Sequence, residues 1–441
     1  MQHASQPCLT RRRFLRATGQ AVLATGLVPA VLARRSRAKA ATLKIAQWTH
    51  FVPDFDDWFD KKFTLEWGEK NGVTVVVDHL SISELRMRAA TEVSAQQGHD
   101  LFGFLDSPAG YEDRIVPMND IVTDCERRFG RLAALAHKGT FNPKTKAYFA
   151  FADSWAPAPL HYRSDWWSEV GVKPDTWDNV REGARKIREK LGVPAGFGLA
   201  PEPDTNKVLR GLLWSHGASE QDEAGRVTIN SKATVDAIKL MATIYKESMT
   251  PDVFLWDPSS NNRAFVWGKG SIIQNAISAI RTAEKQNPEV AKKTMLAAPA
   301  AGPKERLAAE HLLHCYVIWK FAENPDLAKK FLMDFMAGYN DAFRASEFYN
   351  FPSFAKSVSD LRGKLAGDKR SPGRYVVLAD ASSWSACPGH PGYATPAIEE
   401  VLNRWVIPNM FARAARGEQT AEDSARQAEA EMKRIFVKWA K

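Results

Sequence analysis

Short apolar runs alternate with longer amphipathic segments along the first part of the chain. Runs rich in β-branched and aromatic residues predict strands, whereas apolar residues spaced three and four apart predict helices. This pattern predicts strands at residues 43–48, 73–77 and 101–105, and helices at 59–69, ending at Asn71-Gly72, and from Ser83 to Gln97. Because strands alternate with helices, we expect a parallel sheet with both faces covered.

A second group of amphipathic segments follows beyond residue 170. Each predicted helix begins after a residue whose side chain can cap the first turn: Thr176, Ser231, Asn324 and Thr420. Residues 197–199 and 271–275 have the pattern of short strands. About 400 residues beyond the N-terminal segment are too many for one hydrophobic core, so we expect two domains.

The N-terminus has the pattern of an export signal. The apolar run at residues 17–33 is too short and too polar for a membrane-spanning helix, which needs roughly 20 apolar residues. An A-x-A cleavage site follows at Ala38–Ala40, with Val31–Ala33 as a second candidate.

The arginines before that run give the signal its type. Thr10-Arg11-Arg12-Arg13-Phe14-Leu15-Arg16 resembles the twin-arginine pattern, which is an address read by a receptor. We therefore expect residues 1–40 to be a twin-arginine signal peptide, cleaved near Ala40. The protein would be exported to the periplasm by the twin-arginine translocase. An uncleaved anchor is the alternative.

Net charge changes once this segment is removed. The whole chain has 60 basic and 51 acidic residues, a net charge of +9. Residues 1–40 hold eight of the basic residues and no acidic one, so 52 basic and 51 acidic residues remain. A nucleic-acid partner, which would need a basic stripe, is therefore not expected.

Three cysteines lie beyond residue 40, at Cys125, Cys315 and Cys387. They are far apart and lack the CxxC or CxxCH spacing of zinc, iron–sulfur or haem sites. We expect buried thiols and neither a metal nor a cofactor, while a disulfide between two of them remains open. No nucleophile or metal motif indicates catalytic residues.

Several short motifs occur in a characteristic order. They are the strand after Asn71-Gly72, then Ile115–Asp120, Leu160–Trp166, Pro174–Asp178, Phe265–Gly270, Asn324–Phe335 and Gly417–Asp423. Together they resemble the solute-binding proteins of bacterial ABC importers, specifically the extracellular family 1 group that includes maltose-binding protein. Arg163 and Ile272-Ile273 depart from residues that this family often has there.

The resemblance implies a two-lobed α/β periplasmic-binding-protein fold, each lobe a mostly parallel sheet flanked by helices. Lobe one would hold residues 41–153 with 300–350, and lobe two residues 154–299 with 351–441. Hinge crossings are expected near 152–157, 297–301 and 350–354. A monomer would capture a carbohydrate between the lobes, close around it and deliver it to ABC permease subunits in the inner membrane.

Candidate ligand-binding residues follow from position. Ligands of α/β sheets sit beyond the carboxyl ends of strands, and sugars combine hydroxyl groups with apolar faces that stack on aromatic rings. Strand ends and loops supply the candidates Trp48, His50, Asp106, Ser107, Trp155, Asn275, Trp384 and Tyr393. The resemblance favours Tyr393 as the stacking ring of the late loop.

Other functions remain open at this point. A polyamine binder of the same fold would place Asp106 and Asp153 around a cation beside Trp155. A sugar-phosphate binder would use a basic cleft, for which Arg163 and His50 are the only hints. A periplasmic glycoside hydrolase or lyase would need two carboxyl groups across the scissile bond.

Overall fold

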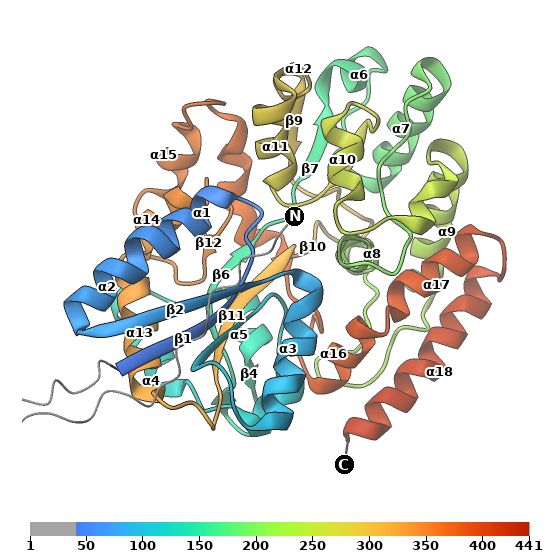
Figure 1. Cartoon of the computed structure of the whole chain (residues 1–441). Coiled ribbons are helices and arrows are strands. Elements are labelled where there is room, and N and C mark those ends of the chain that lie inside the picture. Colours follow the sequence, from blue (N-terminus) through green and yellow to red (C-terminus); the bar gives the residue numbers. More distant parts are fainter. Residues whose placement is uncertain (1–40, 441) are drawn as a thin grey trace, which may run out of the picture. The chain divides into compact units, whose positions relative to one another are not determined.

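A six-stranded mixed sheet dominates the first lobe. A computed structural model describes residues 41–440, and Figure 1 shows the path of the chain. The strands have the order β12-β6-β11-β3-β1-β2. Their bounds are β1 (Ala41–Trp48), β2 (Val73–Leu80), β3 (Leu101–Phe104), β6 (Phe151–Ala156), β11 (Leu312–Ile318) and β12 (Phe351–Pro352). The predicted signal peptide, residues 1–40, lies outside the described residues.

Strand direction in this sheet differs from the prediction. β1 pairs with β2 and β3 in parallel, but β11 runs antiparallel to both β3 and β6, and β12 runs antiparallel to β6. The parallel pairs belong to the alternating strand–helix segment at the start. β11 and β12 are the strands that run against their neighbours, and both belong to later segments of the chain that return to this sheet.

The second lobe contains a smaller, three-stranded sheet. β7 (Leu160–Arg163) lies between β8 (Ile272–Gln274) and β9 (Thr294–Ala297) and is antiparallel to both. The expectation of a mostly parallel sheet is therefore wrong for this lobe as well. Two pairs of two-residue strands complete the list: β4 (Phe141–Asn142) with β5 (Ala147–Tyr148), and β10 (Ala308–Ala309) with β13 (Ser385–Ala386).

The helices follow the capping signals closely. Thr176, Ser231 and Thr420 each accept a hydrogen bond from the third residue beyond, at the starts of α7, α9 and α18. Gly72, with φ of 66°, ends α2 as expected. The helix bounds are α1 (Pro53–Trp58), α2 (Thr64–Asn71), α3 (Ile82–Ala95), α4 (Asn119–Phe129), α5 (Ala134–Thr140), α6 (Ser164–Glu169), α7 (Trp177–Leu191), α8 (Pro203–Ser215), α9 (Lys232–Ser248), α10 (Ser260–Val266), α11 (Ser278–Gln286), α12 (Pro288–Lys292), α13 (Pro325–Ala337), α14 (Tyr339–Ala345), α15 (Leu361–Ala366), α16 (Pro396–Asn403), α17 (Val406–Ala415) and α18 (Ala421–Trp439), with a π-helical turn at Phe59–Phe63 and 3₁₀ helices at Ala109–Arg114, Pro251–Leu255 and Arg374–Ser383.

Three local predictions need correction. α3 begins after Ser81, which forms a capping box with Glu84, and not after Ser83. Asn324 precedes α13 without a side-chain cap. Residues 197–199 do not form a strand, because the backbone there bonds singly to separate segments, as Leu199 does to the carbonyl of Val253.

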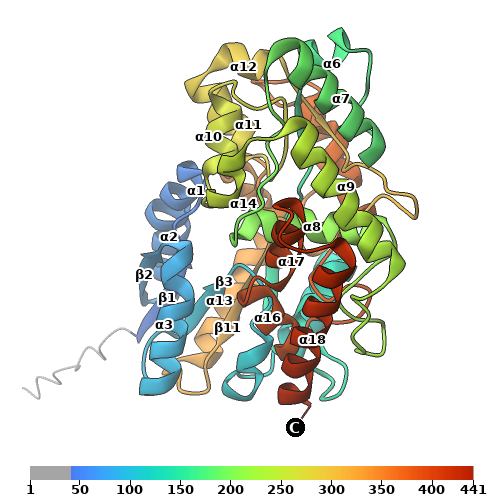
Figure 2. The ribbon, with the colours of Figure 1, turned by 90° about the vertical axis from the view of Figure 1, so that its right-hand side faces the viewer.

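Hydrophobic side chains gather in two main cores. One surrounds the six-stranded sheet and includes Trp48, Phe102 and Phe151. The other includes Leu209 of α8 and Phe411 of α17. α17 and α18 lie side by side in both ribbon views (Figures 1 and 2). The residue boundaries given above for the two lobes stay a prediction. No helix within residues 41–440 is long and apolar enough to cross a membrane.

Candidate functional site

An aromatic wall stands at the carboxyl end of β1. It consists of Trp48, His50, Phe51 and Tyr349. The ring centroids of Trp48 and His50 are 4.6 Å apart, and Tyr349 lies 5.1 Å from His50. Two predicted site residues, Trp48 and His50, are thus neighbours, and Tyr349 joins them from a segment 300 positions later that the sequence analysis did not single out.

His50 is held as a neutral ring. Its Nδ1 accepts from the backbone N–H of Val52 at 2.8 Å, which leaves Nε2 to donate to Oδ1 of Asn350 at 2.9 Å. Burial lowers the pKa of His50 to about 3. Both ring nitrogens are already bonded, so His50 serves this site as a fixed aromatic surface and not as a cation.

A cluster of amides and a carboxylate comes from elements of the second lobe. It consists of Asp204 on α8, Asn261 and Asn262 on α10, and Asn275 just beyond β8, and we call it the amide–carboxylate cluster. The Nδ2 atom of Asn275 lies 2.9 Å from Oδ2 of Asp204, 3.1 Å from Oδ1 of Asn261 and 2.7 Å from Oδ1 of Asn262. An amide nitrogen has only two hydrogens to donate, so three acceptors exceed its capacity. Oδ2 of Asp204 also accepts from Nδ2 of Asn261 at 2.8 Å, and Oδ1 of Asn261 accepts from the backbone N–H of Asn262 at 2.6 Å. The surplus of acceptors around Asn275 therefore lies in spare lone pairs of oxygens that already have a donor, and Oδ1 of Asn262 depends on Asn275.

A second polar group connects segments of both cores. Lys207 on α8 donates to Oδ1 of Asp106 at 2.6 Å and to Oε1 of Glu310 at 2.9 Å, and we call these three residues the charge bridge. Lys207 and Glu310 are buried, whereas Asp106 is partly exposed. The predicted ligand-binding residue Asp106 is thus already bonded to Lys207. The other oxygen of Glu310, Oε2, is buried and has no hydrogen-bond partner within residues 41–440.

His311 connects the amide–carboxylate cluster to the aromatic wall. Its Nδ1 lies 3.8 Å from Oδ1 of Asp204, and its ring centroid lies 6.4 Å from that of Tyr349. The hydroxyl of Tyr349 is buried and has no hydrogen-bond partner within residues 41–440. Aromatic faces, amides and carboxylates therefore form one continuous set, and we take this set as the candidate ligand site.

Burial dominates the electrostatics of this site. It raises the pKa of Asp204, and it raises the pKa of Glu202, which caps α8, to about 8. It also raises the pKa of Glu310 to about 7, although Lys207 opposes this shift. Burial alone would lower the pKa of Lys207. The carboxylates of Asp106 and Glu310 raise it by more, so the pKa of Lys207 is raised overall. The positive charge of Lys207 thus stabilises the neighbouring carboxylates of Asp106 and Glu310.

Ser107 lies beside a different, smaller space. Its hydroxyl is buried without a partner, next to a cavity of about 100 Å³ that also touches Arg86, Asp106 and Glu399. Burial raises the pKa of Glu399 to about 7. Asp106 lines this cavity while belonging to the charge bridge, so it connects the two places.

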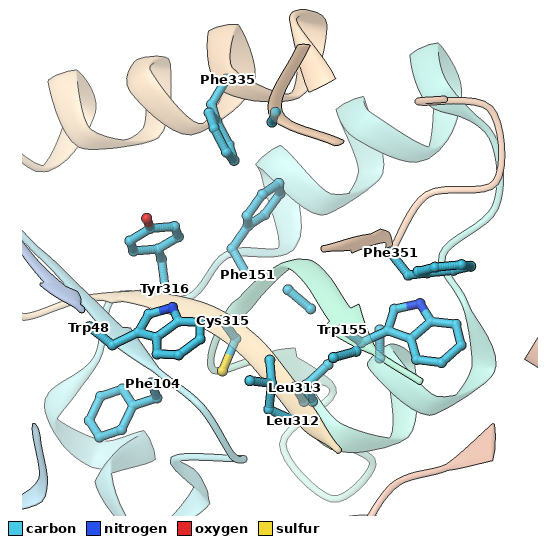
Figure 3. Close-up of a cluster of buried hydrophobic side chains, with 14 of the residues drawn as sticks. Trp48, Phe104, Phe151, Trp155, Leu312, Leu313, Cys315, Tyr316, Phe335 and Phe351 are labelled. Atoms are coloured by element: carbon cyan, nitrogen blue, oxygen red, sulfur yellow. The ribbon is translucent and has the colours of Figure 1, made fainter. Parts of the chain in front are cut away.

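The remaining three predicted residues lie among core or loop neighbours. Trp155 packs on Phe351 with centroids 5.6 Å apart, as Figure 3 shows, and is 2% exposed. Trp384 is 3% exposed, and its indole nitrogen has no partner. The hydroxyl of Tyr393 lies 3.4 Å from Nε2 of His137. No contact between these three and the amide–carboxylate cluster is recorded among the described residues, so their role in ligand binding stays a prediction.

Only Asn275 and Asp106 of the polar site residues were predicted from the sequence. The structure adds Asp204, Lys207, Asn261, Asn262, Glu310 and His311. One signal could have found Asp204: Glu202-Pro203-Asp204 combines an N-cap, a proline at the first helical position and an acid in the first turn, directly after an apolar run. The others come from segments with no local signature.

Cys125, Cys315 and Cys387, the cysteines within residues 41–440, are buried and form no disulfide with one another. Burial raises the pKa of Cys125 to about 12 and the pKa of Cys315 and Cys387 beyond the ordinary range. Within residues 41–440, no group of three or more His, Cys, Asp or Glu side chains is arranged to hold a metal ion.

Comparison with known proteins identifies the family. The family model for bacterial extracellular solute-binding proteins matches residues 52–339, well over half of the chain. The chain belongs to this family. A Brucella abortus (strain 2308) protein, named only as a binding protein, is 22% identical over 334 residues, which cover 72% of this solute-binding protein and 76% of the relative.

Solved structures share the fold of this solute-binding protein. T. maritima MalE3 with bound maltose is 21% identical with a TM-score of 0.72, covering 90% of this chain and 100% of its own. A sugar transporter of Arthrobacter chlorophenolicus A6 with laminaribiose is 12% identical with a TM-score of 0.74, covering 90% and 99%. A solute-binding protein of Agrobacterium vitis S4 with D-mannitol is 20% identical with a TM-score of 0.68, covering 90% and 99%. The two-lobed α/β fold is thereby confirmed.

Proposed function

We propose that this protein captures a carbohydrate, either a sugar, an oligosaccharide or a polyol, between its two lobes for an ABC importer. The observation that carries the proposal is the surplus of acceptors around Asn275. A ligand hydroxyl can donate to a lone pair that the two hydrogens of Nδ2 leave free on one of these three oxygens. The adjacent aromatic wall offers the partly exposed ring of Phe51 to the apolar face of a sugar, and the buried rings of Trp48 and Tyr349 pack against Phe51.

The wider assignment rests on the family. The related structures named above hold maltose, laminaribiose and D-mannitol, three polyhydroxyl compounds. By analogy, the chain is a monomer that makes no covalent change in its ligand and passes it to permease subunits in the inner membrane. Residues 1–40 would direct it to the periplasm through the twin-arginine translocase and then be removed.

A cationic ligand is the second candidate. Asp106 and Glu310 bind the ammonium of Lys207, and Asp204 adds a third carboxyl group on the same helix as this lysine. A polyamine could use the same acceptors through its N–H groups, and the aromatic wall could contact its charge. Unlike a sugar, it would have to compete with Lys207 for the carboxylates.

The experiment is a ligand screen on protein comprising residues 41–441. Thermal unfolding is measured with mono- and oligosaccharides, polyols, polyamines and sugar phosphates, and hits are titrated by calorimetry. A ligand at 100 times its Kd should stabilise the fold by about 2.7 kcal/mol. Mass spectrometry of the ligand after long incubation tests for turnover.

The outcomes separate the candidates. Stabilisation by sugars or polyols alone, with the ligand recovered intact, supports the proposal. Stabilisation by polyamines alone replaces it with the second candidate. Cleavage of an oligosaccharide that a single Asp or Glu substitution abolishes would make the protein a hydrolase or lyase.

A further inference from the structure

A second, strongly basic pocket lies outside the candidate ligand site. Its cavity of about 500 Å³ is formed by α14, α15, the loop at 367–370 and one residue of α11. Five cationic side chains line it, against two carboxylates: Arg281, Arg344, Lys364, Lys369 and Arg370, with Glu347 and Asp368. The lining residues alone carry three more positive than negative charges, but Arg344 pairs with Asp341 at 3.6 Å and Arg281 also pairs with Glu284 at 3.0 Å outside the lining.

The base of the pocket is rigid. Arg281 is 3% exposed and donates to Oδ2 of Asp368 at 2.8 Å and to the backbone carbonyl of Glu347 at 3.0 Å. Its guanidinium lies 4.0 Å from the ring centroid of Tyr375 and 5.5 Å from that of Phe348. The two carboxylates of the lining are bound as well, since Glu347 pairs with Arg370 at 2.8 Å. Both acids are therefore already neutralised within the protein.

The rim, in contrast, offers uncompensated charge. Lys364 donates to the backbone and hydroxyl of Ser359, and no carboxylate within residues 41–440 lies within ion-pair distance of it or of Lys369. Both side chains can therefore turn toward an anion in the cavity without first breaking an ion pair.

The turn beside the pocket has unusual backbone conformation. Glu347 and Phe348 are consecutive non-glycine residues with φ of 50° and 72°. Positive φ is costly for a bulky residue such as Phe and tends to be retained at sites with a function. Here it keeps the Glu347 carbonyl on Arg281 and the Phe348 ring in the wall of the pocket.

We propose that this pocket binds a small phosphate-bearing molecule, independently of the carbohydrate. Phosphate oxygens suit ammonium groups and arginine forks, and the charge excess of the lining matches a multivalent anion. The cavity exceeds the space of one phosphate group, so the ligand carries further atoms, for which the Phe348 ring offers an apolar contact.

The test uses pyrophosphate as the probe and protein comprising residues 41–441. Binding is measured by calorimetry at pH 7.5, with sodium chloride added so that ionic strength stays constant. The variant Lys364→Gln/Lys369→Gln removes the two free cations. The matched control Lys173→Gln/Lys246→Gln removes two exposed lysines that do not line the pocket. Thermal unfolding of each variant confirms that it folds.

We expect saturable binding of one pyrophosphate per chain. The pocket variant should weaken it about tenfold or more, since a hydrogen bond to a charged group contributes that much, while the control variant binds as the parent does. Absence of saturable binding, or equal weakening in both variants, overturns the proposal. Citrate binding as tight as pyrophosphate binding overturns the assignment to phosphate. None of these results depends on carbohydrate binding.

Discussion

The ammonium of Lys207 lies 2.6 Å from the carboxylate of Asp106 and joins a helix of the second core to the end of a strand in the first sheet. The same ammonium bonds to Glu310, which is fully buried. One side chain therefore contacts two carboxylates in segments that are 204 positions apart. The contact among these three residues is therefore a buried ion pair shared by two carboxylates.

Removing that charge should destabilise the protein. Lys207→Met leaves Glu310 buried without its cation, and loss of one partner of a buried ion pair costs about 3–5 kcal/mol. The loss should be smaller at pH 5.5 than at pH 8.5, because the pKa of Glu310, about 7, lets the carboxyl take up a proton in acid. Urea unfolding at both pH values measures it.

A rescue variant and a control variant test the interpretation of this result. Glu310→Gln added to Lys207→Met removes the unpaired acid and should recover part of the stability, with little dependence on pH. Lys246→Met removes an exposed lysine of α9 and should change the unfolding free energy little. If Lys207→Met is no more harmful than Lys246→Met, the charge bridge has no stabilising role.

Asn275 should be decisive for ligand binding. Asn275→Ala removes the donor on which three acceptors converge, leaving Asp204, Asn261 and Asn262 without it. We expect affinity for the carbohydrate found in the screen to fall tenfold or more, because an unpaired buried polar group costs about 1–3 kcal/mol. Calorimetry measures the change.

The control for this prediction is Asn179→Ala on α7, which removes an amide that bonds only to Asp175 near the surface. It should leave affinity unchanged. Unaltered affinity in a folded Asn275→Ala protein would falsify the site assignment.

His50 should make stability fall in acid. Its pKa is lowered to about 3 in the folded protein, whereas the unfolded chain titrates near 6.5. Below pH 6.5 the unfolded state binds a proton that the folded state does not, so stability is lost as pH falls from 6.5 toward 3. The slope from this one group approaches about 1.4 kcal/mol per pH unit.

The variant His50→Gln isolates this effect. Glutamine can still donate to Asn350 but does not titrate. As the pH is lowered from 6 to 4, the unfolding free energy of the parent should fall by more than that of the variant. Above pH 7.5 the difference between the two unfolding free energies should be constant. Comparing the two proteins cancels other groups, including His161, whose pKa is also lowered to about 3. A difference that does not vary with pH would contradict the assignment.

Export should depend on two arginines of the N-terminal segment. Arg11→Lys/Arg12→Lys keeps the charge but removes two guanidinium groups, which ammonium groups do not replace. We expect the precursor to stay in the cytoplasm, as judged by fractionation and immunoblotting. Arg13→Lys, at the variable position of the pattern, is the control and should be exported. Normal export of the double variant would point to a different route.

Local features were predictable where one stretch of sequence determines them. The caps Thr176, Ser231 and Thr420 and the end of α2 at Gly72 depend on side chains and φ values of a single turn. Strand direction was not predictable, because β11 pairs with β3 and β6 from more than 150 positions away.

The site was predictable only in part for the same reason. Strand-end position identified Asn275 and Asp106, but their partners Asp204 and Lys207 come from a helix 71 and 101 positions away. Tryptophan content predicted stacking surfaces, yet it cannot predict which rings are buried: Trp48 and Trp155 are each 2% exposed, and Trp155 packs against Phe351.

The buried thiols make this protein convenient for labelling. Thiol reagents attack the thiolate, and burial raises the pKa of Cys125 to about 12 while enclosing all three cysteines beyond residue 40. We therefore expect these three thiols of the folded protein not to react with a maleimide dye. In protein comprising residues 41–441, which lacks Cys8, one cysteine introduced at an exposed position, such as Lys173→Cys, would carry a single fluorophore without removal of Cys125, Cys315 or Cys387. Because its own thiols are buried, the protein can serve as the scaffold of an optical sensor that carries one dye.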